Sequence, residues 1–372
     1  MARRKKRKDG YLRKSFTFHG KRYYVYGRTA EELLSKEIEK RAELEQDKEK
    51  LVNPTLTEYS SHFTAVRRAE IKESTIRSQK IQFNVIANVV MAKGILFGSM
   101  RLKEITRRNI EDARQILLNE GKTPQYLNNC FSHLNHVFNT AYLDDTIDKN
   151  PCKALKQLKR DAPLIGENKH RALSEDETIR FFNAAKDANS YYLNAFLIMA
   201  KTGMRIGEVA GLYETDIDRK NGFIHVRRTV VRSETGDYRL GENTKTQSGA
   251  RDIPLTGELY SIIREQVNMN HMLFGLKLHD MIFKSVEGNI IREYSVNREI
   301  KRICKSANID VFTCHAFRNT FATRFIEQRP QDYKILSEIL GHKDVKITLN
   351  LYTHVMTENK VAAMQELMIK TS

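Results

Sequence analysis

The sequence lacks the segments that would place the protein in or across a membrane. No apolar run approaches the roughly 20 residues that a membrane-spanning helix needs. No hydrophobic stretch follows the basic N-terminus, as one would in a secretory signal. We therefore expect a soluble, cytoplasmic protein that makes no contact with a membrane.

Cysteine is also scarce. The 372 residues contain four cysteines, which lie far apart and without CxxC spacing (Cys130, Cys152, Cys304 and Cys314). This spacing argues against a disulfide framework and against a zinc site. We expect four free thiols in a reducing compartment.

Two common cofactor sites are missing as well. The sequence has no glycine-rich nucleotide-binding loop. Glu208, the carboxylate in the candidate site described below, has no second carboxylate beside it of the kind that a divalent metal requires. We therefore expect no metal and no other cofactor.

Acidic residues are too few to balance the basic ones. Lysine and arginine number 63 against 46 aspartate and glutamate residues, which gives a formal net charge of +17. An excess of this size, spread over the whole chain, indicates a polyanionic partner, although a basic but otherwise ordinary enzyme is the alternative. The length suggests two or three domains.

Residues 1–53 predict a small first domain. A basic tail at residues 3–8 precedes two alternating segments, 11–18 and 21–26, which meet at His19-Gly20 as in a hairpin. Thr29 and Glu32 have the spacing of a capping box for a helix that runs to about Leu51. We expect a three-stranded sheet backed by this helix, with aromatic and basic strand faces suited to DNA. A small module without DNA contacts is about equally compatible with the sequence.

Residues 54–160 predict a helical domain. Asn53-Pro54 marks its start, and apolar residues recur at helical spacing in four segments: 57–66, 74–90, 106–119 and 124–142. Basic residues decorate these helices. A charged helical face is usually only solvated, but the basic neighbouring segments favour DNA contact here.

Residues 161–372 predict a larger α+β domain after a lysine-rich linker. Ser174 and Glu177 form a second capping box. Helices are expected at 175–187, 191–201, 255–272, 294–307, 314–328, 333–340 and 358–369, and strands of a small sheet at 222–228, 238–240 and 251–255. The chain as a whole is therefore expected to be multidomain and mainly helical.

Four short stretches of this domain carry groups that suit a phosphate site. Arg205 lies between two glycines with Glu208 one turn along, and Lys245 lies in a polar turn between strands. An arginine in such a turn can offer a bidentate fork to a phosphate, which Glu208 would hold in place. The alternatives are a surface Arg–Glu pair, which contributes little, and an ordinary solvated lysine.

The other two stretches lie near the C-terminus. His315 and Arg318 are three residues apart and share one helix face. Gly341 is typical of a helix end, and His342 follows it, with Tyr352 ten residues further on. A surface pair and a buried histidine with a packed tyrosine are the alternatives for each stretch taken alone.

Taken together, these groups can cleave a phosphodiester. Two arginines and a histidine would stabilise the negative charge of the transition state, and Tyr352 is the candidate nucleophile. A tyrosine hydroxyl with its ordinary pKa of about 10 needs a base or a cationic neighbourhood. His315 is a candidate for that proton transfer, and Lys245 for protonating the leaving 5′-oxygen.

At these residues the chain resembles the tyrosine recombinase (phage integrase) family. The segments TGMRIGEVAGL from Thr202, HAFRNTFAT from His315 and LGHKDVKITLNLYTHV from Leu340 occur in the family's order and spacing. The resemblance implies that all six catalytic positions are filled, by Arg205, Lys245, His315, Arg318, His342 and Tyr352. Glu208 stands at the family's supporting acidic position. Asn319 departs from the second histidine that many members have there, but this position is not catalytic.

The resemblance also implies an architecture and partners. Residues 1–53 would be an arm-type DNA-binding domain, as in integrases of temperate phages and conjugative transposons, 54–160 a core-type DNA-binding domain, and 161–372 the catalytic domain. The protein would be a site-specific integrase that integrates and excises a mobile element through a 3′-phosphotyrosyl intermediate. It would act as a homotetramer on double-stranded DNA at specific attachment sites, with accessory proteins for DNA bending and directionality as further candidate partners.

Two other functions remain open at this stage. A type IB topoisomerase-like relaxase would reseal the same strand, but an arm-type module has no use in simple swivelling. A non-catalytic DNA-binding regulator would have no chemical need for Tyr352 or Lys245.

Overall fold

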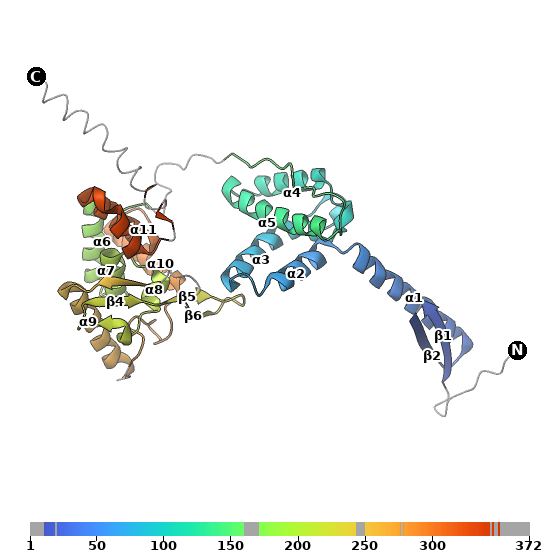
Figure 1. The fold of residues 1–372 in the computed structure, drawn as a ribbon, viewed down its shortest axis with the longest axis horizontal. Helices are drawn as coiled ribbons and strands as arrows, with labels where there is room; N and C mark the ends of the chain where they lie inside the picture. The colour runs from blue at the N-terminus through green and yellow to red at the C-terminus, as the bar shows by residue number, and fades with distance from the viewer. Residues whose placement is uncertain are drawn as a thin grey trace, which may run out of the picture. The chain divides into compact units, whose positions relative to one another are not determined.

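The computed structural model describes residues 11–18, 21–159, 171–242, 250–275, 277, 279–342, 344, 345 and 349. The chain divides into two compact units, Met1–Asp161 and Ala162–Ser372 (Figure 1). This division lies one residue from the predicted boundary after residue 160, whereas the predicted boundary after residue 53 falls inside the first unit. The three-domain organisation therefore stays a prediction.

The first unit begins with a hairpin and a helix. Strand β1 (Leu12–Phe18) pairs antiparallel with β2 (Lys21–Gly27), and helix α1 (Ala30–Val52) follows. Phe16, Val25 and Leu33 form its small core. Among the described residues this sheet has two strands, not the three predicted, because the chain enters α1 directly after β2.

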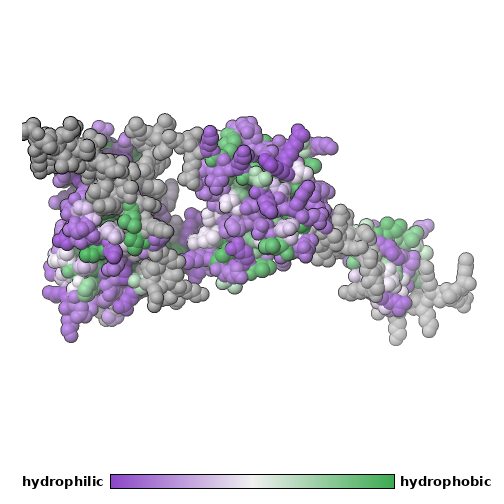
Figure 2. Space-filling model, turned by 45° about the horizontal axis from the view of Figure 1, so that its top comes forward, coloured by the Kyte–Doolittle hydropathy of each residue, from purple (hydrophilic) through white to green (hydrophobic). Residues whose placement is uncertain are grey.

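Four helices form the rest of the first unit: α2 (Leu56–Arg67), α3 (Glu73–Ala87), α4 (Arg107–Asn119) and α5 (Pro124–Leu143). Short 3₁₀ turns connect α3 and α4 at Ala92–Gly94, Phe97–Ser99 and Leu102–Glu104. Local signals set the helix starts: the Thr55 side chain caps α2, and Thr123 caps α5 with Pro124 in its first turn. Hydrophilic residues cover most of the described surface of this unit that is visible in Figure 2, around the core that the helices enclose.

The second unit is a helical domain with two small sheets. Its helices are α6 (Glu175–Asp187), α7 (Leu193–Thr202), α8 (Ile206–Ala210), α9 (Gly257–Phe274), α10 (Glu293–Ala307), α11 (His315–Gln328) and α12 (Tyr333–Leu340). Turns of 3₁₀ helix lie at Glu214–Asp216 and Pro330–Asp332. Its core gathers Phe181, Phe196, Phe312 and Phe317, whose rings pack edge to face or tilted.

The predicted single sheet is two sheets. Strands β3 (Ile217–Asp218), β4 (Phe223–Val226) and β7 (Arg251–Pro254) form one antiparallel sheet in the order β3-β4-β7. Strands β5 (Arg228–Arg232) and β6 (Tyr238–Glu242) form a separate hairpin. The segment predicted as one strand over 222–228 breaks at Arg227, where the chain leaves β4 to start β5.

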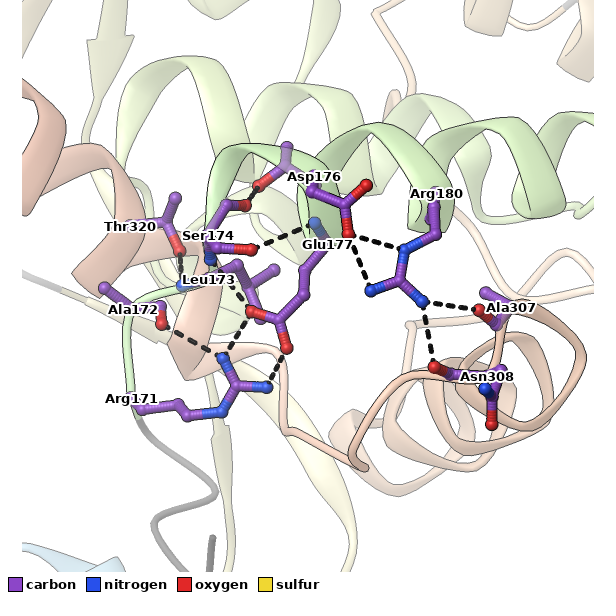
Figure 3. Close-up of polar contacts among 11 residues, drawn as sticks. Arg171, Ala172, Leu173, Ser174, Asp176, Glu177, Arg180, Ala307, Asn308 and Thr320 are labelled. Atoms are coloured by element: carbon purple, nitrogen blue, oxygen red, sulfur yellow. Dashed lines mark hydrogen bonds and ion pairs between the residues drawn. The ribbon is translucent and has the colours of Figure 1, made fainter. Parts of the chain in front are cut away.

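The start of the second unit is fixed by a polar cluster (Figure 3). Arg171 donates to both carboxylate oxygens of Glu177, which also accepts from the backbone N–H of Ser174 at 2.9 Å. The backbone N–H of Leu173 donates to the buried Thr320 hydroxyl of α11, also at 2.9 Å. These bonds attach the entering chain to α6 and α11 before the candidate site begins.

Several expectations fall on undescribed residues: the basic tail, the His19-Gly20 turn, most of the linker, Lys245, Tyr352 and the helix at 358–369. The four cysteines are buried and form no disulfide, as predicted. A search of the described residues finds no helix that is both long and apolar enough to cross a membrane.

Candidate functional site

A tight turn between α7 and α8 places Arg205. Gly203 ends α7 with a φ of 67°, in the left-handed region that glycine adopts at little cost. A Cβ atom at this position would lie 2.6 Å from Leu340 and 2.7 Å from Phe321, so α11 and α12 pack directly against the turn. Arg205 follows in extended conformation, with its side chain 43% exposed.

Glu208 fixes the position of Arg205 by hydrogen bonds. Its carboxylate accepts from the Arg205 backbone N–H and from Arg205 Nη1, each at 2.9 Å. The side chain is only 6% exposed. Burial alone would raise the pKa of this carboxyl, but the bonds from Arg251 and Arg205 outweigh it and lower the pKa below its ordinary value. Glu208 is therefore a buried anion paired with two guanidinium groups, and its supporting role stays a prediction.

Arg318 lies deeper than Arg205. It is 3% exposed, and it donates to the Gly203 carbonyl at 2.9 Å and to the Leu340 carbonyl at 2.7 Å. Burial, followed by the nearby charge of Arg205, lowers the pKa of Arg318 to about 9. The group is still cationic at neutral pH, and its two carbonyl bonds fix the guanidinium plane between the α7–α8 turn and the end of α12.

The two histidines approach the arginines from different elements. His315 is the first residue of α11, and His342 follows the left-handed Gly341 that ends α12. Burial, and then the charges of Arg318, Arg205 and further basic groups including His315, lower the pKa of His342 to about 4. In the chain alone His342 is therefore a neutral imidazole at pH 7 and can donate one hydrogen bond without carrying charge.

Arg205, His315 and Arg318 line one cleft of about 370 Å³. The rest of its lining comes from the α7–α8 turn, the β5–β6 hairpin and three residues near α10 and α11 (Met204, Ile206, Gly207; Thr229, Val230, Arg232, Tyr238; Ile291, Glu293, Cys314). His342 lies close enough to Arg205 and Arg318 for their charges to affect its pKa. Four of the six predicted catalytic residues are thus brought together, whereas Lys245 and Tyr352 lie outside the described residues.

Sequence reasoning missed two neighbours of this cleft. Arg251, on β7, binds both oxygens of Glu208 at 3.1 and 2.7 Å, and it is 43 residues away in sequence. Glu293 lines the cleft with its carboxylate 4.0 Å from the Cys314 sulfur. No local pattern marks either residue, because each acts through a partner on a distant element.

Within the described ranges, no cluster of three or more His, Cys, Asp or Glu side chains has a geometry that could hold a metal ion. The charges facing the cleft come mainly from guanidinium groups, and such groups bind phosphate oxygens directly.

The chain matches known proteins over the region that builds this cleft. The family model described as "Phage integrase family" matches residues 171–359, which is half of the chain. A "Tyrosine recombinase XerC-like" protein of Caldanaerobacter subterraneus subsp. tengcongensis is 28% identical over 288 residues, covering 73% of each chain.

Solved structures agree with this match. The Tn1549 transposon integrase in complex with transposon right end DNA superposes with a TM-score of 0.68 and 25% identity, over 84% of this chain and 99% of that one. A lambda integrase tetramer bound to a Holliday junction shares the fold, with a TM-score of 0.59 and 20% identity, over 92% of this chain and 96% of that one.

The chain therefore belongs to the phage integrase family. Its class is that of the site-specific DNA recombinases that move mobile elements, as the sequence predicts. The fold class is confirmed as well: a mainly helical chain with a small N-terminal sheet and an α+β unit of the tyrosine recombinase type.

Proposed function

We propose that this chain cuts and rejoins DNA strands through a 3′-phosphotyrosyl intermediate formed on Tyr352. The observation that carries the proposal is the cleft in which Arg205, His315 and Arg318 converge, with the neutral His342 beside them. A cleft lined by fixed guanidinium groups suits the extra negative charge that a phosphodiester develops on its non-bridging oxygens in the transition state.

Each group has a role in the proposed step. The Tyr352 oxygen attacks phosphorus, the bond from phosphorus to the 5′-oxygen breaks, and the 5′-oxygen leaves as a hydroxyl. Arg205, Arg318 and His342 donate to the non-bridging oxygens. His315 takes part in transfer of the tyrosine proton, and Lys245 supplies the proton to the leaving oxygen.

The reverse step joins a new strand. The 5′-hydroxyl of a partner strand attacks the phosphotyrosine, the bond to Tyr352 breaks, and the tyrosine regains its proton. One phosphodiester is broken for each one that is made, so the exchange needs no external energy source. The covalent bond to the protein also protects the broken end until the partner strand arrives.

The proposal extends to the partners. The substrate is double-stranded DNA at specific attachment sites, contacted by the helices of the first unit and, at a second distal site, by the hairpin of β1 and β2. The active assembly is a homotetramer on two DNA sites, as the fold shared with the lambda tetramer suggests. Proteins that bend DNA or set directionality are further candidate partners.

A suicide substrate tests the proposal. A duplex carrying an attachment site and a nick near the cleavage point loses a short fragment after attack, which traps the covalent protein–DNA adduct. We expect an adduct that survives denaturation, together with strand exchange between two intact sites. DNA binding with no adduct would instead indicate a non-catalytic regulator. An adduct with relaxation of supercoils, but no exchange between sites, would indicate a topoisomerase-like relaxase.

A further inference from the structure

Arg251 is a buried, charged residue beside the cleft, and it has no role in the proposed chemistry. It is the first residue of β7, its side chain is 7% exposed, and it is not among the residues that line the cleft. A buried arginine is costly unless its donors are paired. Among the described residues, the Arg251 side chain donates three hydrogen bonds, and all of them go to groups that position cleft residues.

The first two bonds go to Glu208. Arg251 Nη1 and Nη2 donate to the two carboxylate oxygens at 3.1 and 2.7 Å, which is a bidentate fork. The same carboxylate accepts one side-chain bond from Arg205. Two guanidinium groups thus share one buried carboxylate. Arg251, which does not line the cleft, donates two side-chain bonds to it, whereas Arg205 donates one.

The third bond goes to the end of α12. Arg251 Nε donates to the Ile339 carbonyl at 2.5 Å, and the Leu340 carbonyl next to it accepts from Arg318. A Cβ atom at Gly341 would lie 3.1 Å from the Arg251 side chain, so the backbone that leads to His342 passes directly over this guanidinium. Arg251 therefore contacts Glu208, which holds Arg205, and the end of α12, where the next carbonyl accepts from Arg318 and the chain continues to His342.

We propose that Arg251 is a positioning residue that neutralises Glu208 and clamps the end of α12, so that the charge of Arg205 stays available to the DNA phosphate. Without Arg251, the buried Glu208 would have Arg205 as its main counter-ion, and the carboxylate would compete with the phosphate for the same guanidinium. The inference rests on the proposed function, because it assigns a role in the same cleavage step.

Charge compensation predicts that substitutions of Arg251 and Glu208 are energetically coupled. Arg251→Met, which roughly keeps the length of the side chain but removes its charge and donors, should slow single-turnover cleavage of the suicide substrate by about 100-fold, the lower end of the loss when one transition-state donor is removed, because Arg205 would then be held by Glu208. DNA binding should stay within a few-fold. Adding Glu208→Gln to this variant removes the uncompensated anion and should recover cleavage by about 10-fold relative to Arg251→Met alone, a coupling that a double-mutant cycle measures.

The pH profile gives a second readout. Glu208 faces Arg205 on the turn before α8, Arg251 on β7 and the charge of Arg318 on α11, and His342 faces the same three arginines. Loss of Arg251 removes the main influence that lowers the Glu208 pKa. Arg251→Met should therefore cleave relatively better as the pH falls, because protonation of Glu208 releases Arg205. Glu208→Gln in the same background should abolish this dependence.

Arg228 provides a matched control. It makes the same kind of fork, to Asp216 at 3.1 and 2.8 Å, from strand β5 of the separate hairpin, but among the described residues Asp216 is not bonded to a cleft arginine. Arg228→Met should leave the cleavage rate within a few-fold of wild type. Circular dichroism and DNA binding of each variant check that it folds, and Arg251→Lys, which keeps the charge but not the fork, should lie between wild type and Arg251→Met.

The outcomes separate the two proposals. Wild-type adduct formation with normal cleavage by Arg251→Met would overturn the role of Arg251 alone. Additive effects of Arg251→Met and Glu208→Gln, or an equal loss in Arg228→Met, would reduce Arg251 to a structural residue and also overturn it. Absence of any adduct with the wild-type chain would overturn the proposed function, and this inference with it.

Discussion

At the scale of single residues, the candidate site depends on guanidinium groups whose orientation is fixed before DNA arrives. Arg318 binds two carbonyls and Arg205 is held by Glu208, so neither has to be ordered by the substrate. Fixed donors of this kind stabilise developing charge without reorganisation during the reaction. The planar fork, and not merely the positive charge, is therefore the property that matters.

This account predicts the effect of conservative substitutions. Arg205→Lys and Arg318→Lys should each lower the cleavage rate by about 100- to 1000-fold with folding retained, because a point-charge ammonium cannot reproduce the fork on two phosphate oxygens. Single-turnover cleavage of the suicide substrate measures the loss. Arg302→Lys is the control, since Arg302 also pairs with a glutamate three residues away but lies on the exposed face of α10. Near-normal rates in both site variants would make these structural arginines.

Lys245 is tested by changing the leaving group. Lys245→Ala should cleave an ordinary substrate slowly, but it should approach wild-type rates when sulfur replaces the 5′-bridging oxygen. A thiolate leaves without protonation, because the pKa of a thiol, about 8.5 for cysteine, lies far below that of an alcohol. Equal defects on the oxygen and sulfur substrates would show that Lys245 only positions DNA.

Sequence patterns could propose the residues of the candidate site, but they could not predict the contacts between them. Arg205, Glu208, His315, Arg318 and His342 could be proposed because glycines and helical spacing mark them locally. The partners that hold them could not. The bonds from Arg318 to Gly203 and from Arg251 to Glu208 span 115 and 43 residues, and no periodicity reports such distances.

At the scale of elements, helix starts were predictable because their signals are local. The predicted helix at 175–187 coincides with α6, since Ser174 and Glu177 satisfy each other's backbone donors. Strands were predicted less well. The break at Arg227 and the separation into two sheets depend on which distant segment each strand pairs with, and not on the alternation within the strand.

The charge of Glu177 stabilises the start of the second unit in a pH-dependent way. Its hydrogen bonds from Arg171 lower the pKa of Glu177 to about 2. A depressed carboxyl pKa contributes stability that is present above the unfolded value of about 4.3 and is lost as the pH falls through the folded value. Glu177→Gln keeps one oxygen that can cap the helix, but it removes the charge and replaces the other oxygen by an amide NH2 that cannot accept from Arg171.

We expect Glu177→Gln to destabilise the full chain by about 1–3 kcal/mol at pH 7, as loss of a charged hydrogen bond does. The difference from wild type should shrink as the pH falls from about 4 to 2. Thermal or urea unfolding measures it. Asp176→Asn is the control, because its pair with Arg180 is on the surface, with the Asp176 side chain 74% exposed, and such pairs contribute little. A deficit that is equal at pH 7 and pH 3 would contradict this role.

At the scale of the whole molecule, we expect the residues after the proposed nucleophile to link assembly to catalysis. Val361, Met364, Leu367 and Met368 predict an amphipathic helix. We expect it to dock into a neighbouring protomer, and its position would then set the placement of the Tyr352 segment. Folding back onto its own domain is the alternative.

Deleting the chain from Glu358 should leave binding to a single site intact, abolish tetrameric synapsis and alter cleavage by isolated protomers. Sedimentation or native gels of the truncated protein on paired sites measure this effect. Tetramers and full-rate recombination by the truncated protein would show that the segment serves only its own domain or is dispensable.

The central claim is that DNA becomes covalently attached to Tyr352, and trapping the adduct tests it most directly. Wild-type protein and Tyr352→Phe are reacted with the nicked substrate, and peptide mapping locates the attached nucleotide. Tyr333→Phe, on α12, serves as the control. We expect the wild type and Tyr333→Phe to carry the nucleotide on the peptide that contains Tyr352. Tyr352→Phe should form no adduct while binding DNA within a few-fold, because it lacks only the hydroxyl. An adduct of wild-type yield in Tyr352→Phe, or attachment at another residue, would contradict the account.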